Sequence, residues 1–109
     1  MEKQTVGELL PRSLKAVENV NKEFSTAVLN GDIEIVKKLI NQATNFNEAL
    51  VHAVDFSFNI DIVRLVLEKA TKFDEAIHRA RMYNRMEMLR MIMKRKKQLK
   101  EKKSNIINV

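Results

Sequence analysis

The sequence predicts an all-α fold built as a stack of three helix-turn-helix repeats. The chain of 109 residues contains two glycines and one proline, too few turn-forming residues for the many tight turns of a β-rich protein. Ala27, Ala53 and Ala80 anchor three similar stretches that lie 26 and 27 residues apart. Such a period is typical of repeat proteins, in which each unit covers the apolar face of its neighbour.

Apolar and acidic residues recur around these alanines in a common register, with one extra residue allowed in the second copy. Three and seven positions upstream, the recurring apolar residues are Phe24, Leu50 and Ile77, and Val20, Phe46 and Phe73. Downstream, the aligned residues are Ile33, Ile60 and Met86, then the acids Glu34, Asp61 and Glu87, then Leu39-Ile40, Val66-Leu67 and Ile92-Met93. Because each set has helical spacing, every copy is predicted to contain two helices.

Local signals divide the chain into a cap, three repeats and a tail. Residues 1–19 are interpreted as an N-terminal helical cap, in which Thr5 and Glu8 form a capping box and Pro11 ends a turn or begins a helix. The repeats cover about 20–45, 46–72 and 73–97, and residues 98–109 form a basic tail that we expect to be mobile.

The predicted boundaries within the repeats depend on capping residues. Asn30-Gly31 supplies the turn between the first two paired helices, and Asp32 and Asn59 are placed to cap the second helices of the first two copies. Asn45 and Glu48 have capping-box spacing at the start of the second copy. Small alanines at the anchor positions are expected where two helices approach closely.

The repeats resemble ankyrin repeats. The stretch from Ala27 to Ile40, with Asn30-Gly31 and Ile35-Val36, resembles the second half of an ankyrin repeat, and residues 77–80 (Ile-His-Arg-Ala) resemble the Leu-His-x-Ala core of the ankyrin signature. The Thr-Pro dipeptide is replaced by Glu48-Ala49 and Glu75-Ala76. The period is shorter than the usual 33 residues, and the deficit lies where ankyrin proteins carry their β-hairpin fingers. The resemblance therefore implies a degenerate ankyrin-like stack without fingers, and a protein-binding role.

Several classes of function have no support in the sequence. Without cysteine, the chain has no disulfide, thiolate metal ligand or cysteine nucleophile. His52 and His78 are not at equivalent repeat positions and lack partners at motif spacing, so we expect no enzyme activity, metal or cofactor. His78 is expected to bond a neighbouring loop instead. No apolar run reaches the roughly 18 residues of a membrane span, and no signal peptide is recognised, so a cytoplasmic protein without membrane contact is expected.

The leading functional hypothesis is a small non-catalytic module that binds a partner protein as an inhibitor or adaptor. Its first helices are expected to expose one row of side chains along the stack. The methionines of the last helix either fill the core or form an exposed adhesive patch with Met88 and Met91, which fall off the apolar stripe, and a homodimer is predicted through that surface. The predicted partner-binding residues are Asn47, Val51, His52, Asp55, Asp74, His78, Arg79, Met88 and Met91.

The alternative hypothesis is binding of nucleic acid through the C-terminal basic segment. Residues 1–93 contain equal numbers of basic and acidic residues, so the formal net charge of +6 arises entirely from residues 94–109. A basic helix face of this kind neutralises phosphates without reading base sequence. The predicted residues are Arg85, Arg90, Lys94, Arg95, Lys96, Lys97 and Lys100.

Overall fold

The computed structural model describes the backbone of residues 2–57 and 59–107 and the side chains of residues 15–57 and 59–102. Within these residues it contains helices only, which confirms the predicted all-α class. The helices are α1 (Glu2–Asn30), α2 (Ile33–Leu39), α3 (Phe46–Phe56), α4 (Ile60–Lys69), α5 (Asp74–Met82) and α6 (Met86–Ile107).

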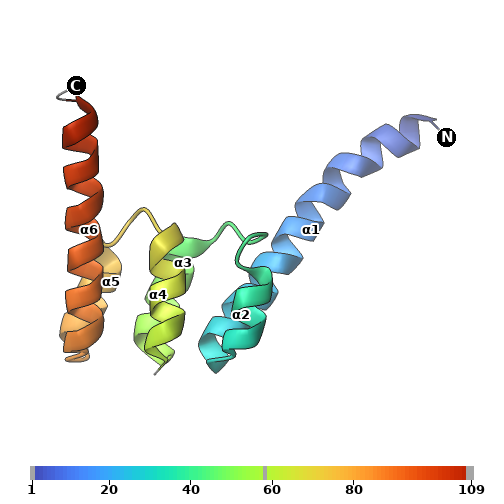
Figure 1. Ribbon diagram of the computed structural model, residues 1–109. Helices are drawn as coiled ribbons and strands as arrows, with labels where there is room; N and C mark the ends of the chain where they lie inside the picture. The colour runs from blue at the N-terminus through green and yellow to red at the C-terminus, as the bar shows by residue number, and fades with distance from the viewer. Residues whose placement is uncertain (1, 58, 108–109) are drawn as a thin grey trace.

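The helices pack as consecutive pairs in two rows (Figure 1). Within each pair α1 contacts α2, α3 contacts α4 and α5 contacts α6. Between pairs, α3 contacts both α1 and α5, while α4 contacts both α2 and α6. The links between pairs, residues 40–45 and 70–73, contain no strand. Each pair is therefore covered by its sequence neighbours, and α5–α6 forms one end of the molecule.

One apolar core runs through the pairs. The three anchor alanines are buried, as predicted, with exposed fractions of 3 % for Ala27 and 0 % for Ala53 and Ala80. Phe24 is also fully buried, and its ring meets the ring of Phe46 edge to face, with centroids 5.7 Å apart. This contact joins the first helix of one pair to the first helix of the next.

The turns of the first and third pairs share one backbone geometry. Gly31 has φ +71°, and its N–H and that of Asp32 bond the carbonyls of Val28 and Ala27, the pattern of a Schellman motif. Asn84 has φ +55° and stands in the same place after α5, where it makes the equivalent bonds. Both residue types tolerate this left-handed conformation. The extra residue of the second copy therefore lies in the turn between α3 and α4.

Asparagine side chains fasten each loop between pairs to the preceding first helix. Asn21 Oδ1 accepts the backbone N–H of Thr44 at 2.9 Å, and Asn21 Nδ2 donates to Thr44 Oγ1 at 3.0 Å. One repeat later, Asn47 Oδ1 accepts the N–H groups of Thr71 and Lys72, and Asn47 Nδ2 donates to Thr71 Oγ1. We call Asn21 and Asn47 the loop clamps. They supply partners for backbone groups that no sheet satisfies.

The predicted caps are partly correct. Asp32 accepts the N–H of Ile35 and Asn59 accepts the N–H of Asp61, as expected. The predicted capping box of Asn45 and Glu48 is wrong. No cap bond forms at Asn45, and its Oδ1 has no partner among the described residues, while its Nδ2 donates to Ser25 Oγ at 2.8 Å across the junction between α1 and α3.

Both terminal helices are longer than the predicted segments. α1 continues through Pro11 and residue 19, where the sequence predicted the cap to break and to end. α6 continues through residue 98 to Ile107, without a boundary between repeat and tail. Of the cap's apolar side chains, Val17 is 41 % exposed, and those of residues 1–14 lie outside the described residues.

Removing one loop clamp is expected to destabilise the fold. Asn47→Ala removes the acceptor of two exposed backbone N–H groups, which water can then solvate, so the free energy of unfolding should fall by about 0.5–1.5 kcal/mol. Urea denaturation followed by circular dichroism measures this change. Asn41→Ala, at an exposed position of the preceding loop, is the matched control and should stay within about 0.5 kcal/mol. Equal stabilities of the two variants would contradict the clamp role.

Enlarging a central anchor alanine is expected to overpack the core. Ala53 is completely buried, so Ala53→Leu should lower the free energy of unfolding by on the order of 1–3 kcal/mol. The same substitution at exposed Ala16 of α1 is the control, because an added side chain there meets no packed neighbour. A thermal melting curve for Ala53→Leu that matches the unaltered protein would show that the helices do not approach closely here.

Candidate functional site

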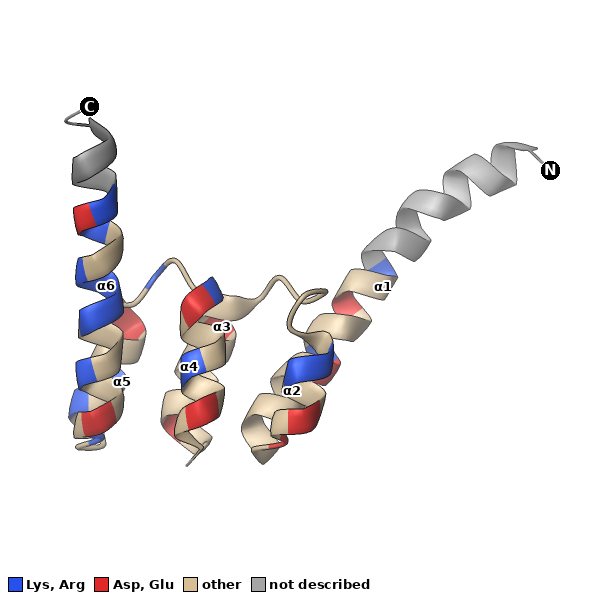
Figure 2. Cartoon of the chain, in the orientation of Figure 1, with Lys and Arg blue, Asp and Glu red and all other residues tan. Residues whose placement is uncertain are grey.

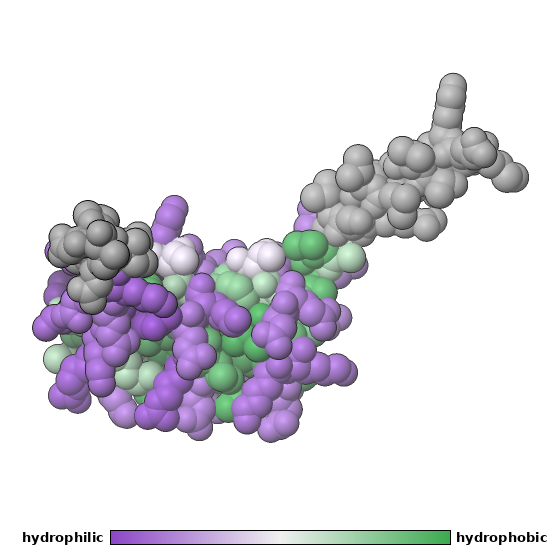
Figure 3. Space-filling view, turned by 45° about the horizontal axis from the view of Figure 1, so that its top comes forward, coloured by the Kyte–Doolittle hydropathy of each residue, from purple (hydrophilic) through white to green (hydrophobic). Residues whose placement is uncertain are grey.

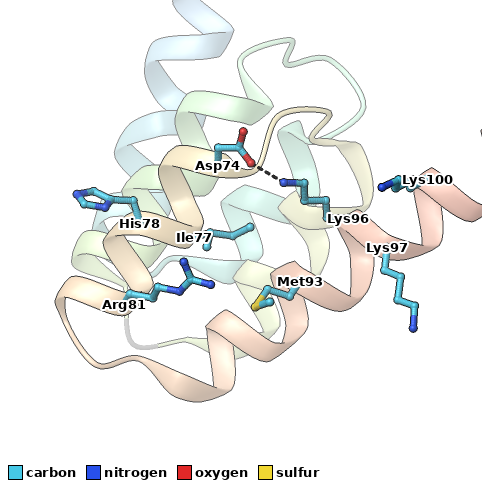
Figure 4. A pocket seen from close by; sticks show the side chains of 8 residues that line it. All are labelled: Asp74, Ile77, His78, Arg81, Met93, Lys96, Lys97 and Lys100. Atoms are coloured by element: carbon cyan, nitrogen blue, oxygen red, sulfur yellow. Dashed lines mark hydrogen bonds and ion pairs between the residues drawn. The ribbon is translucent and has the colours of Figure 1, made fainter.

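A groove of about 450 Å³ opens between α5 and α6 at the end of the stack (Figure 4). Met93 of α6, which is 45 % exposed, forms most of its apolar floor, and Ile77 of α5, which is 9 % exposed, completes it. Its polar lining consists of Asp74, His78, Arg81, Lys96, Lys97 and Lys100. We call this the basic groove.

The basic groove has a strong excess of positive charge. Arg81 contributes from α5, and three lysines contribute from α6. Among the described residues lining it, the carboxylate is that of Asp74, which Lys96 Nζ contacts at 2.7 Å. The side chain of Asp74 is 87 % exposed, and such exposed pairs stabilise a fold little. The groove therefore offers several cations to an anionic ligand. The contact that a ligand would have to break, between Lys96 and Asp74, stabilises the fold little.

The basic groove lies on the faces of α5 and α6 that point away from the rest of the stack. On the opposite side of α5, Arg79 binds Asp55 of α3 at 2.8 Å. On the opposite side of α6, Arg95 donates to the carbonyl of Glu68 in α4 at 3.3 Å. The groove is thus the surface left uncovered because the described residues contain no helix beyond α5 and α6.

Basic residues cover α6 more densely than any other described helix (Figure 2). The exposed ridge of Arg90, Lys94 and Lys97 follows one face of α6, at the spacing the sequence predicted. Lys97 belongs both to this ridge and to the basic groove. Figure 3 shows hydrophilic side chains along the outer surfaces of α2, α4 and α6, with apolar residues in the furrows between them. The charge of α6 therefore faces solvent.

The predicted row of partner-binding residues on the first helices is largely used in internal contacts. Asn47 is a loop clamp, and Val51 is partly buried against the core. The side chain of Asp55 is 9 % exposed and is paired with Arg79. The expectation of an exposed row is wrong here, because these side chains face the junction between α3 and α5. Asp74 and His78 are exposed and line the basic groove.

The ion pair of Arg79 with Asp55 joins α5 to α3 and is part of the internal packing. A hydrogen bond to Glu75, followed by the charge of Asp55, raises the pKa of Arg79 above its ordinary value. A raised pKa gives stability that is present below the pKa of the unfolded chain and is lost only when the pH rises through the folded value. Arginine titrates far above neutrality, so this contact gives no pH sensitivity near pH 7.

The expected adhesive patch of Met88 and Met91 is wrong. Met88 is only 4 % exposed, and Met91 is partly buried beside Leu67 of α4. In repeat register Met88 aligns with Ile62, which is also buried. Both positions face the preceding second helix, because α6 packs against α4 as well as α5. The described surface therefore offers no dimer contact through Met88.

The histidines have ordinary surroundings. His52 Nε2 lies 3.1 Å from Glu48 Oε1, one turn earlier in α3. His78 is exposed in the basic groove, so the expected bond to a neighbouring loop is not formed. No group of three or more possible metal-binding side chains occurs among the described residues.

The predicted nucleic-acid residues fall into two groups. Arg90, Lys94, Lys97 and Lys100 are exposed, and Lys96 is half-exposed while it contacts Asp74. Arg85 and Arg95 are partly buried, since Arg85 donates to the backbone carbonyl of Asp55 and Arg95 to that of Glu68. Those two arginines thus hold neighbouring helices.

Arg81 is the charged residue of the groove that neither predicted set of site residues contains. Its register mates Val28 and Val54 are both completely buried. A charged residue at a repeat position that is otherwise apolar was the available signal for an uncovered end. Ile77 and Met93 were assigned to apolar stripes, but their place on the groove floor depends on the absence of a following pair.

The chain matches none of the family models, curated proteins or solved structures with which it was compared. No helix among the described residues has the length and apolar character to cross a membrane. The geometry of the chain itself therefore carries the functional argument.

Proposed function

We propose that this protein is a non-catalytic interaction module that acts as an inhibitor or adaptor by occupying the surface of a partner protein. The observation that carries the proposal is the basic groove, where cations of α5 and α6 surround an apolar floor at the exposed end of the stack. Charged rims around apolar centres are common in protein-binding surfaces. The partner surface is accordingly acidic, because charge complementarity speeds encounter and excludes wrong partners.

An ankyrin-like architecture is part of this proposal. Its support is the succession of helical pairs in repeat register, joined by links without strands. The loop clamps recur with the same register, which favours a true repeat over three unrelated hairpins. Repeat stacks present extended surfaces, and in this one the end face carries the strongest charge.

Nucleic-acid binding through α6 is the second candidate function. The exposed ridge of Arg90, Lys94 and Lys97 favours it, since three cations on one helix face can contact successive phosphates. The ridge shares Lys97 with the basic groove, but Arg90 and Lys94 lie outside the groove lining. Separate substitutions in the two surfaces therefore distinguish the two functions.

Charge removal in the groove is expected to weaken binding of an acidic polypeptide. We expect poly-L-glutamate to bind the full chain, and Arg81→Gln combined with Lys100→Gln to weaken this binding by about tenfold through loss of two attractive charges. Fluorescence anisotropy with labelled poly-L-glutamate across a salt series measures the effect. Lys37→Gln with Lys38→Gln, two exposed positions of α2, is the matched control and should retain binding.

Duplex DNA in the same salt series tests the second candidate. If α6 binds phosphates through its ridge, Arg90→Gln with Lys94→Gln should reduce the log–log salt slope by roughly 0.9 per lost contact. Poly-L-glutamate binding that is unaffected by the groove substitutions would contradict the proposed function. Tight DNA binding that the ridge substitutions abolish would favour the second candidate instead.

A further inference from the structure

The basic groove occupies the place where each earlier pair receives the first helix of the next pair. In α3 the register mates of Asp74, Ile77, His78 and Arg81 are Asn47, Leu50, Val51 and Val54. Asn47 holds the loop that leads into α5, while Leu50 and Val54 are completely buried. In α1 the register mate of His78 is Ser25, which bonds Asn45 at the start of α3. These positions therefore form the docking face of each first helix.

The last copy keeps the centre of this docking face and changes its border. Ile77 preserves the apolar residue that Phe24 and Leu50 provide in the earlier copies. Met93, the register mate of buried Leu67, extends the apolar floor but remains 45 % exposed because no helix covers it. Arg81 replaces a buried valine at the border. The face thus remains shaped for a helix while it gains positive charge.

Asp74 preserves the acceptor of the loop clamps. It stands one residue after Phe73, as Asn47 stands one residue after Phe46, and a carboxylate accepts backbone N–H groups as an amide oxygen does. Lys96 contacts it in the uncovered groove. Its side chain is 87 % exposed, so the acceptor is available to an incoming backbone.

We propose that the basic groove binds an acidic amphipathic helix of a partner protein, seated as the first helix of a further repeat would be. The apolar side of that helix covers Ile77 and Met93, its acidic flanks meet Arg81, Lys97 and Lys100, and the N–H groups before its first turn bond Asp74. This inference rests on the proposed function, because it names the chemistry of the partner at the same groove.

The positive charge and the apolar floor of the groove together favour an acidic amphipathic helix over two other ligands, a second copy of this chain and a nucleic acid. α1 of a second copy carries mixed exposed charges, Lys15 and Lys22 with Glu18 and Glu23, and so complements the groove poorly. A nucleic-acid backbone would satisfy the cations but would leave the apolar floor without a partner. An amphipathic helix satisfies both, which is the usual helix-in-groove mode of recognition.

The test uses three synthetic peptides of about 14 residues, long enough to form helix on binding. The first has leucines at positions i, i+3, i+4 and i+7 with glutamates on both flanks. The second has the same composition in an order that separates the leucines, and the third has lysine in place of glutamate. We expect the full chain to bind the first about tenfold more tightly than the second, and to show no binding of the third.

Two variants separate the floor from the charges. Met93→Gln, at a half-exposed position, should weaken the first peptide several-fold and poly-L-glutamate by much less, because the substitution keeps every cation of the groove. Arg81→Glu with Lys97→Glu should weaken both ligands, whereas Lys37→Glu with Lys38→Glu on α2 should weaken neither. Circular dichroism verifies that each variant keeps the helical content of the unaltered protein.

The results distinguish failure of the helix inference from failure of the proposed function. Equal binding of the first two peptides, with poly-L-glutamate still bound through the groove, overturns the helix inference and leaves the proposed function standing. Absence of binding to every acidic ligand overturns both. Sedimentation that reports self-association of the protein alone, lost in Arg81→Glu, assigns the groove to a second copy and overturns the acidic-helix inference.

Discussion

The structure depends on contacts between successive helical pairs, which complete the burial of apolar residues in the described part of the chain. Ile62 and Met88 are buried in helices that pack on a preceding second helix, while their register mate Ile35 in α2 is 40 % exposed and the described residues place no second helix before α2. Leu67 is covered by α6, while its register mate Met93 is exposed. Burial at an aligned position thus follows the presence of a neighbouring pair, which is the behaviour expected of a stacked repeat, where terminal units differ from internal ones.

The loop clamps show how short links are made compatible with this stacking. A link of a few residues leaves backbone N–H groups that need acceptors, and Asn21 and Asn47 provide them from the helix on which the next pair docks. One side chain therefore fixes both the loop and the position of the following helix. The ion pair of Arg79 with Asp55 acts at the same junction from the other side.

Electrostatics separates the internal junctions from the end of the stack. Arg79, Arg85 and Arg95 each bind an atom of a neighbouring helix, so their charges stabilise the packing. Arg81, Lys97 and Lys100 face the open groove instead. The same residue type thus has two roles, which the position along the stack determines. In the proposed function the second group provides the contact with an acidic partner.

The sequence by itself determined the helical class, the close packing at the anchor alanines and the caps at Asp32 and Asn59, because these depend on local spacing and on backbone groups a few residues away. It also placed the basic residues of the exposed ridge, since a helix face follows from periodicity alone. Only the tertiary structure decided that Met88 is buried, that Asn47 and Asp55 hold the next pair, and that Ile77 and Met93 line a groove. Each of these depends on which helix lies opposite the residue. The spacing of a residue within its own helix does not reveal which other helix will pack against it.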